Sequence, residues 1–408
     1  MKEAMGNRID LAPKKGALNG TFELPLSKSM VNRALLLAAL FPEITLSGMS
    51  SSSDSQYLQQ VLDGYLGDSA MVGAGGTTLR FATAYWACKE GASQELYGTE
   101  TLNKRPIAPL VEALNVLGGD VRYSKVEGQA PLLVKGKKIK GGSYHMGHVE
   151  SSQFITALML ISPKMEEGLH LTWDSVPSQP YLVMTAALLR ESGFEVLLTN
   201  EEFRIAPGQM PKKVELFMER DWSAVAFWCE VVALAEDAEI ELVGFKEESL
   251  QGDSRVLDYF EPLGVRSQFK NDSLFLSKKS VLDLGKFTAN LISEPDLAQA
   301  LITTLLLQKI PFEIHGLQTL KRKETDRIGA LVNLAERLGV AVRATKDSLI
   351  CEGYPEHLQL AQNIFDSLED HRVAMSLAPV SLKFPLSIDR PEVVEKSYPE
   401  FWDHFSQL

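Results

Sequence analysis

The sequence predicts an α/β protein of two domains, each built from repeated subdomains that contain two helices and several strands. The chain has 408 residues, which is long enough for two substantial hydrophobic cores. Hydrophobic residues make up 45% of the chain and charged residues 23%, as in ordinary soluble globular proteins. The third observation is an internal repeat, in which a helical pattern ends at a glycine and an alternating strand pattern follows.

Four copies of this repeat are identified by their glycines. A glycine directly after a helix suits the left-handed backbone that often closes helices. The glycines are separated by 75, 71 and 75 residues, which is longer than the period of common solenoids, so each copy is predicted to be a compact subdomain. The four are Gly118, Gly193, Gly264 and Gly339.

An earlier copy is predicted to be shortened. A helical pattern over 57–62 ends at Gly64, only 54 residues before Gly118. The stretch from Asp63 to Gly73 is too short for the pair of strands that the other copies contain. The first repeat is therefore expected to lack these strands.

The composition excludes several classes of partner. The formal net charge is −12, and no stripe or tail of Lys and Arg offsets it, which argues against a nucleic-acid partner. Three cysteines are too widely spaced for a disulfide framework or a metal site. Because the sequence has neither a signal peptide nor an apolar run of membrane-spanning length, a soluble cytoplasmic protein is predicted.

The segment Lys-Glu-Thr-Asp-Arg at 323–327 is predicted to begin a helix, because apolar residues follow it at helical spacing. In a helix, Lys323 and Arg327 are four residues apart and Glu324 and Arg327 three apart, so the side chains would be neighbours. Two cations beside a carboxylate at a helix N-terminus can hold an anion and transfer a proton. A solvated, ion-paired charge cluster explains this segment alone equally well.

Five other segments with Lys, Arg, Ser or carboxylate side chains also precede helical patterns. Helix N-termini carry unpaired N–H groups and partial positive charge, and they bind phosphates and carboxylates. Each one alone is more often an ordinary helix cap. All six together predict a shared cleft for a multiply anionic substrate. The five are Ser27-Lys28-Ser29 with Asn32-Arg33, Gly75-Gly76-Thr77-Thr78, Ser151-Ser152-Gln153, Ser293-Glu294-Pro295-Asp296 and Asp370-His371-Arg372.

From Leu24 to Pro399, the chain resembles the 5-enolpyruvylshikimate-3-phosphate synthase family. The resemblance depends on the order and spacing of many short motifs, each of which is weak by itself. Besides the segments above, they include Gly76-Thr77-x-x-Arg80, Arg105-Pro106-Ile107, Pro180-Tyr181, Asp370-His371-Arg372-x-Ala374-Met375 and Lys396-Ser397-x-Pro399.

The resemblance implies a two-domain, inverted α/β barrel-like enolpyruvyl transferase fold. Each domain is expected to contain repeated βαβαββ units with helices inside and sheets outside. A change from strand to helix near Arg220 marks the predicted boundary. The first, discontinuous domain is predicted to comprise residues 1–20 and 220–408, and the second to comprise 21–219, with the active site in the cleft between them.

The resemblance also implies an activity. The enolpyruvyl group of phosphoenolpyruvate would be transferred to the 5-hydroxyl of shikimate 3-phosphate, releasing phosphate through a tetrahedral intermediate. This step belongs to the shikimate pathway, which leads to chorismate and the aromatic amino acids. No metal or organic cofactor is expected. The two small substrates are the only expected partners, and a monomer is predicted.

Site residues follow from the resemblance position by position. Glu324 is implied to exchange a proton with the methylene carbon and Asp296 with the hydroxyl, and Lys28, near the reacting oxygen, is implied as a residue that could share these roles. The residues implied to bind shikimate 3-phosphate are Lys28, Ser29, Arg33, Ser151, Ser152, Gln153, Ser178, Tyr181, Asp296 and Lys323. Those implied to bind phosphoenolpyruvate are Lys28, Gly76, Arg105, Gln153, Arg327, Arg372 and Lys396.

Two alternatives remain open at this point. The UDP-N-acetylglucosamine enolpyruvyl transferases share the expected fold and donor, but they typically carry a reactive cysteine in a loop that corresponds to Thr101–Lys104, where this chain has none. A noncatalytic metabolite-binding relative would not need Lys28, Asp296 and Glu324 together. One departure from the resembled family is Ala74, which replaces a common Asn beside the phosphoenolpyruvate site.

Overall fold

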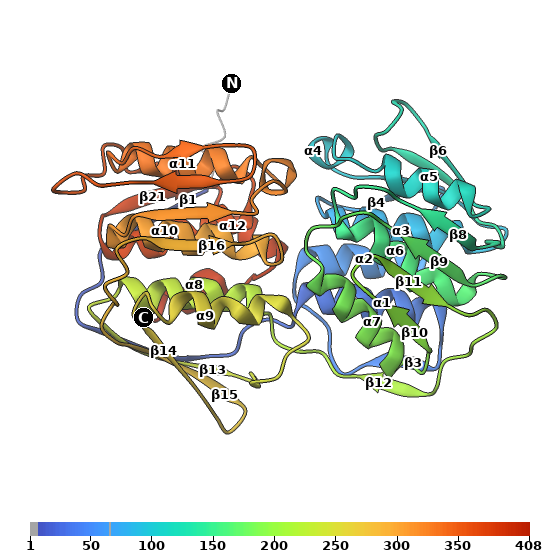
Figure 1. Ribbon diagram of the computed structural model, residues 1–408, viewed down its shortest axis with the longest axis horizontal. Coiled ribbons are helices and arrows are strands. Elements are labelled where there is room, and N and C mark those ends of the chain that lie inside the picture. The colour runs from blue at the N-terminus through green and yellow to red at the C-terminus, as the bar shows by residue number, and fades with distance from the viewer. Residues whose placement is uncertain (1–6, 65–66) are drawn as a thin grey trace. The chain divides into compact units, whose positions relative to one another are not determined.

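The computed structural model describes residues 7–64 and 67–408, which form two compact units (Figure 1). The first unit contains residues 7–25 with Arg220–Leu408, and the second contains Leu26–Glu219. The predicted division after residue 20 lies inside strand β2 (Ala17–Phe22), which pairs with β13 (Asp237–Val243). Because this pairing continues to Phe22, the first unit extends to Pro25.

Two complete repeats make up most of the second unit. In each repeat, a helix joins two parallel strands, and a second helix leads to an antiparallel pair of strands. If the four strands are numbered in chain order, their order across the sheet is one, two, four, three. One repeat contains β4 (Ser69–Met71), α3 (Gly76–Ala87), β5 (Ser93–Tyr97), α4 (Glu100–Asn103), α5 (Ala108–Val116), β6 (Asp120–Tyr123) and β7 (Leu132–Lys135). The next contains β8 (Gly142–His145), α6 (Ser152–Ile161), β9 (Leu169–Thr172), α7 (Pro180–Glu191), β10 (Val196–Leu198) and β11 (Glu202–Ile205).

The first unit has two complete repeats with the same strand order. One contains β2, α8 (Trp222–Leu234), β13, α9 (Val256–Phe260), β14 (Val265–Lys270) and β15 (Ser273–Lys278). The other contains β16 (Phe287–Asn290), α10 (Ala298–Gln308), β17 (Phe312–His315), α11 (Arg327–Arg337), β18 (Arg343–Ala344) and β19 (Leu349–Cys351). The βαβαββ unit of the resembled family is therefore present four times in the residues that the structure describes.

Each unit also has an incomplete repeat. In the second unit, β12 (Val214–Leu216), α1 (Lys28–Leu40), β3 (Ile44–Leu46) and α2 (Ser53–Asp63) form a two-stranded parallel sheet with its helices. The predicted shortening is confirmed, because no strand is found between α2 and β4 in the described residues there. The first unit ends with β20 (Ile364–Asp366), α12 (His371–Leu377), β21 (Leu386–Asp389) and α13 (Phe401–Ser406), whose sheet is completed by β1 (Arg8–Leu11). The sequence did not predict this second incomplete repeat.

The predicted glycine closures are confirmed. The four repeat glycines have φ values of 106°, 97°, 94° and 72°, all in the left-handed region. After α7, the N–H of Phe194 donates to the Leu189 carbonyl oxygen, and after α11 the N–H of Val340 donates to the Ala335 carbonyl oxygen. These bonds satisfy carbonyl groups that would otherwise be left unpaired at the helix ends.

The first helix of each repeat lies in the interior of its unit. Nearly every residue of α3, α6, α8, α10 and α12 is buried. Helices α1, α3 and α6 contact one another in the second unit, and α8, α10 and α12 do so in the first. Strands such as β13 alternate between buried and exposed residues, as expected for sheets that cover helices on one face. The expected arrangement, with helices inside and sheets outside, is confirmed.

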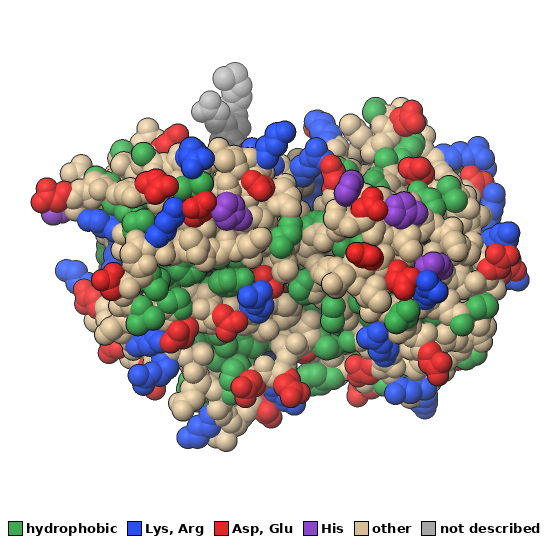
Figure 2. Space-filling view, in the orientation of Figure 1, with side chains coloured by type: hydrophobic (Ala, Val, Ile, Leu, Met, Phe, Trp, Pro, Cys, Tyr) green, Lys and Arg blue, Asp and Glu red, His purple; other side chains and the backbone are tan. Residues whose placement is uncertain are grey.

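The surface of the protein has mixed charge. On the face shown in Figure 2, Lys and Arg side chains are interspersed with Asp and Glu over both units. Within residues 7–64 and 67–408, no helix is both long and apolar enough to cross a membrane.

One buried carboxyl group breaks the apolar pattern of α8. Glu230 is fully buried, and neither of its carboxyl oxygens has a hydrogen-bond partner among the described residues. Burial holds the pKa of Glu230 well above its usual range, because a charge is poorly solvated in the protein interior. Glu230 therefore keeps its proton to a higher pH in the folded protein than in the unfolded chain.

Replacing Glu230 with Gln is expected to increase stability more at pH 8 than at pH 5. In the unfolded chain, the carboxyl group ionises above about pH 4.3. Because the pKa of Glu230 is raised in the folded protein, the stability linked to its protonation is fully present below about pH 4.3 and is lost as the pH rises toward the native pKa. The variant's advantage should grow by up to about 1.4 kcal/mol per pH unit. Urea unfolding of both proteins across this pH range measures the difference, and a difference that does not change with pH would contradict the assignment.

Candidate active site

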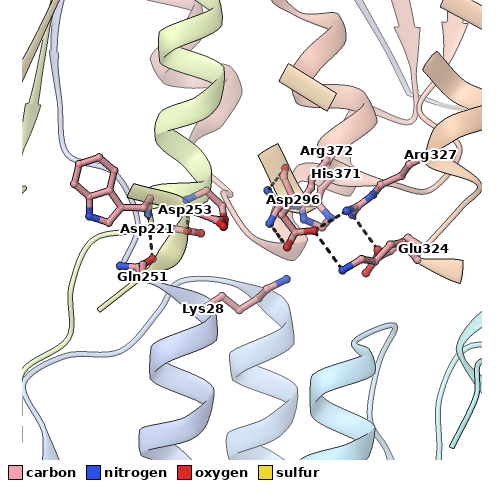
Figure 3. Close-up of polar contacts among 12 residues, drawn as sticks. Lys28, Asp221, Gln251, Asp253, Asp296, Glu324, Arg327, His371 and Arg372 are labelled. Carbon is pink, nitrogen blue, oxygen red and sulfur yellow. Dashed lines mark hydrogen bonds and ion pairs between the residues drawn. The ribbon is translucent and has the colours of Figure 1, made fainter. Parts of the chain in front are cut away.

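The first unit gathers a network of charged side chains around Arg327. This residue begins α11, and its side chain is only 2% exposed. Its Nη1 donates to Asp296 Oδ1 at 2.9 Å, and its Nη2 donates to Glu324 Oε2 at 3.0 Å. Its Nε and Nη2 also donate to the two oxygens of Asp370, at 2.7 and 3.2 Å. One guanidinium thus holds three carboxylates in fixed positions, and its contacts with Asp296 and Glu324 can be followed in Figure 3.

The structure corrects the predicted start of this helix. Asp326 is the N-cap, and its side chain accepts a hydrogen bond from the Gly329 N–H. Lys323 and Glu324 therefore precede α11 rather than form its first turn, and Lys323 has a non-helical backbone with ψ −148°. The capping preference of Asp decides the start, because its carboxylate satisfies a free N–H at that end. Glu324 and Arg327 are still neighbours, as predicted.

Asp296 receives three cations. It lies in a short 3₁₀ turn, Pro295–Leu297, directly before α10. Besides Arg327, it pairs with Arg372 Nη2 at 2.9 Å and with Lys323 Nζ at 3.4 Å. Burial by itself would raise the pKa of Asp296, but the positive charges of Arg372, Lys323 and Arg327 hold it well below its usual range. This carboxylate is therefore ionised at neutral pH.

Glu324 is held from two sides. Its Oε2 accepts the hydrogen bond from Arg327, and its Oε1 accepts one from Lys396 Nζ at 2.6 Å. Lys396 comes from near the end of the chain, 72 residues away. Glu324 is 14% exposed, so it is accessible to a ligand while its position is fixed by two cations.

Asp370 organises two of the predicted cations. It is the N-cap of α12, and its Oδ1 accepts a hydrogen bond from the Arg372 N–H at 2.9 Å. The same carboxylate binds the Arg327 side chain and is fully buried. The sequence identified Asp370 only as part of a motif, since its pairing with Arg327 spans 43 residues.

A second acid beside Asp296 was not predicted. Asp253 is buried and accepts a hydrogen bond from the Ser223 hydroxyl at the start of α8. Burial and the negative charge of Asp296, opposed by Arg372, raise the pKa of Asp253 to about 7. Gln251, two residues before Asp253, connects this segment to the start of α8, because its Oε1 accepts a hydrogen bond from the Trp222 N–H at 3.1 Å (Figure 3). No sequence motif marked this acid.

In the second unit, Arg33 is a buried cation. Its Nη1 donates to the Ser29 carbonyl oxygen at 2.6 Å, and its Nε donates to Thr185 Oγ1 at 2.9 Å. The guanidinium also lies 5.3 Å from the ring centre of Tyr181 and 5.7 Å from that of Phe81. Burial lowers the pKa of Arg33 to about 10, so it remains charged at neutral pH. No carboxylate in the described part of the chain forms an ion pair with it.

The other predicted residues of this unit also lie at helix starts. Lys28 is the first residue of α1, and its Nζ pairs with Asp54 Oδ2 at 3.0 Å. Ser151 caps α6 by accepting a hydrogen bond from the Gln153 N–H at 3.4 Å, and Ser152 is the first residue of that helix. Ser178 precedes α7 with a left-handed φ of 58°.

Two guanidinium groups lie close to Gly76. A Cβ atom added to Gly76 would lie 2.4 Å from Arg80 Nη1 and 3.1 Å from Arg105 Cζ. The lack of a side chain at Gly76 therefore lets two guanidinium groups approach the N-terminus of α3. Arg80 also donates to Gln153 Oε1 at 2.8 Å. The sequence identified Arg80 only as part of a motif.

Each unit therefore has its own cluster of predicted residues. The first unit brings together Asp296, Lys323, Glu324, Arg327, Arg372 and Lys396. In the second, one group surrounds Arg33 and another surrounds Gly76. In the described ranges, no group of three or more His, Cys, Asp or Glu side chains is arranged to hold a metal ion.

Comparison with known proteins identifies similar chains. The family model described as EPSP synthase (3-phosphoshikimate 1-carboxyvinyltransferase) matches residues 54–405. A 3-phosphoshikimate 1-carboxyvinyltransferase of Bacteroides fragilis strain YCH46 is 35% identical over 390 residues, covering 95% of this chain and 94% of that protein. The enzyme of the same name from Pseudoalteromonas translucida is 31% identical over 415 residues, covering 95% and 96%.

Solved structures have a similar fold. EPSP synthase from Acinetobacter baumannii superposes with a TM-score of 0.75 at 18% identity, covering 98% of each chain. The enolpyruvyl transferase NikO from Streptomyces tendae superposes with a TM-score of 0.71 at 13% identity, covering 99% of this chain and 98% of that one.

Proposed function

The chain belongs to the EPSP synthase family and transfers the enolpyruvyl group of phosphoenolpyruvate to shikimate 3-phosphate, and we propose specific roles in this reaction for the residues of its charged clusters. The observation that carries the proposal is that both candidate acids, Asp296 and Glu324, form ion pairs with cations. Asp296 and Glu324 are each held by cations, Arg327 binds both, and both remain partly accessible. Two fixed carboxylates amid cations suit a reaction that moves protons between anionic substrates.

Shikimate 3-phosphate is proposed to bind through its two anionic groups. Arg33, with no carboxylate partner among the described residues, supplies the charge for the ring carboxylate, with Ser29 beside it. The 3-phosphate is assigned to hydroxyl and amide donors near the starts of α6 and α7, where free N–H groups favour anions. The residues proposed for the phosphate and ring are Ser151, Ser152, Gln153, Ser178 and Tyr181, with Lys28, Asp296 and Lys323 at the hydroxyl groups.

Phosphoenolpyruvate is proposed to bind to the cations that now hold the two acids. Arg372 is paired with Asp296, Lys396 with Glu324, and Arg327 with both. Binding would exchange some of these internal carboxylate contacts for contacts with the carboxylate and phosphate of the substrate. Arg105 and the backbone at Gly76, with Gln153 and Lys28, are proposed to hold the remaining oxygens of phosphoenolpyruvate.

The proposed chemistry uses each acid once in each direction. Glu324 in its protonated form gives a proton to the methylene carbon of phosphoenolpyruvate, and Asp296 takes the proton of the 5-hydroxyl as its oxygen bonds to C2. The product of this step is a tetrahedral ketal phosphate. Glu324 then removes a proton from the new methyl group while the bond between C2 and the phosphate oxygen breaks, and Asp296 gives the hydroxyl proton to the departing phosphate. Lys28 stabilises charge near the reacting oxygen.

Phosphate release is the direct test. The protein should release one phosphate for each enolpyruvyl group transferred, only when both substrates are present, and equally well with a chelator. No cofactor is required by the proposed roles, so added metal should have no effect. Phosphate release from phosphoenolpyruvate alone, or a strict need for a divalent metal, would contradict the proposal.

We also propose, from the family resemblance, that the protein acts as a monomer in the cytoplasm. Sedimentation at micromolar concentration, with and without substrates, measures the oligomeric state. A dimer under both conditions would contradict the monomer.

A further inference from the structure

We infer that Arg80 is a positioning residue, which fixes the orientation of the Gln153 amide and the loop that carries Arg105. Both of these residues then present N–H donors to an anionic ligand. The inference rests on the proposed assignment of Gln153 and Arg105 to substrate contacts, and it extends that assignment to a residue that need not touch the substrate.

The contacts of Arg80 define its geometry. It lies in α3 and is 3% exposed. Its Nη1 donates to Gln153 Oε1 at 2.8 Å, and its Nη2 donates to the Pro106 carbonyl oxygen at 2.7 Å. Its Cζ lies 5.0 Å from the ring centre of Phe154, the next residue after Gln153. The planar guanidinium thus joins α3 to the start of α6 and to the Pro106 loop, which a single ammonium group could not do.

The bond to Gln153 selects one orientation of its amide. A glutamine side chain has one acceptor oxygen and one NH₂ group with two donors. Because Arg80 has only donors, the oxygen must face it, and the reversed amide would place donors against donors. The Gln153 Nε2 group is therefore directed away from Arg80 and is presented to oxygen acceptors. Phosphate and carboxylate oxygens are such acceptors.

The bond to Pro106 acts on the neighbouring cation. Pro106 follows Arg105 directly, so fixing its carbonyl group restricts the backbone on which the Arg105 side chain is mounted. A Cβ atom at Gly76 would lie 2.4 Å from Arg80 Nη1 and 3.1 Å from Arg105 Cζ, so both guanidinium groups lie close to Gly76. Arg80 therefore also adds a positive charge near the N-terminus of α3, where an anion is favoured.

The Arg80→Lys variant tests this role, because lysine keeps the charge but cannot donate to both acceptors from one plane. The KM for phosphoenolpyruvate is expected to rise about 10- to 100-fold, the usual effect of losing a hydrogen bond that serves a charged ligand, while kcat falls much less. Arg122→Lys is the matched control: Arg122 is exposed in β6 of the same unit and pairs with Asp120, so both constants should remain those of the parent.

The Gln153→Ala variant shows whether Arg80 acts through Gln153. In that background, the effect of Arg80→Lys on KM should be clearly smaller than in the parent, because the amide that Arg80 orients is gone. An equal effect in both backgrounds would overturn the role through Gln153. If Gln153→Ala raises KM but Arg80→Lys does not, the inference is wrong and the substrate assignment stands. If neither variant changes KM, the substrate assignment of Gln153 is itself wrong.

The Gln153→Glu variant keeps the test decisive if Arg80→Lys does not fold. Glutamate still offers an acceptor oxygen to Arg80, but it replaces the Nε2 donors with a second oxygen. The melting temperature should be close to that of the parent, and the KM for phosphoenolpyruvate should rise at least 10-fold, as expected when donors to an anion are lost. An unchanged KM in this variant would overturn the proposed orientation.

Discussion

The Glu324→Gln variant is expected to lose turnover by a factor on the order of 10²–10⁴, the usual size of an acid–base contribution. The amide keeps the size of the side chain and one acceptor oxygen, so it can retain the hydrogen bond from either Arg327 or Lys396 but not both in their present geometry. It cannot cycle a proton to the methylene carbon. The KM values should change much less than kcat, because the variant removes a proton-transfer step rather than a binding contact.

Glu336→Gln is the matched control for this variant. Glu336 is exposed in the same helix, α11, and lies outside the charged cluster, so its variant should turn over at the parental rate. Steady-state phosphate release measures kcat and KM for all three proteins. If Glu324→Gln retained near-parental turnover, Glu324 would be only a structural partner of Arg327.

The Arg327→Leu variant is expected to be the most destabilised of the variants considered. Leucine fills much of the space but leaves the carboxylates of Asp296, Glu324 and Asp370 without their shared cation. Removing one partner of a buried ion pair typically costs about 3–5 kcal/mol, because the remaining charge is uncompensated. Urea unfolding followed by circular dichroism measures the loss.

Two further variants separate charge from packing at this position. In an Asp370→Asn background, Arg327→Leu should be less harmful, because one uncompensated charge has been removed. Arg343→Leu, on an exposed residue of β18, should change stability by less than about 0.5 kcal/mol. If Arg327→Leu and Arg343→Leu had equal effects, the network around Arg327 would not contribute to folding.

Features set by local interactions were predicted well from the sequence. The repeat glycines were identified because the end of a helix requires a left-handed residue, and that requirement acts over a few residues. Ser151 and Asp370 were found at helix starts for the same reason, since a cap is a local hydrogen bond. Glu324 and Arg327 are three residues apart and met as expected.

Features that depend on packing between distant segments were missed. Arg327 pairs with Asp370 across 43 residues, so the pair exists only once α11 and α12 have both packed against α10. Asp253 is an acid in an otherwise unremarkable turn, and its raised pKa arises from burial and from Asp296, which is far away in the sequence. The start of α11 was misplaced because the charged segment was taken as the first helical turn, whereas the Asp326 side chain accepts the Gly329 N–H and the helix begins after it.

Strands β1 and β2 lie at the start of the chain but pair with much later strands, and this affects how the chain folds during synthesis on the ribosome. Arg8 in β1 pairs with Asp389 across 381 residues, and β2 pairs with β13, which lies beyond the whole second unit. At a synthesis rate of about 5–20 residues per second, β1 would wait roughly 20–75 s for its partner. Leu26–Glu219 can acquire its structure during that interval, because its strands all pair within it. The second unit is therefore expected to fold first, β2 to pair once β13 has been made, and β1 to pair last.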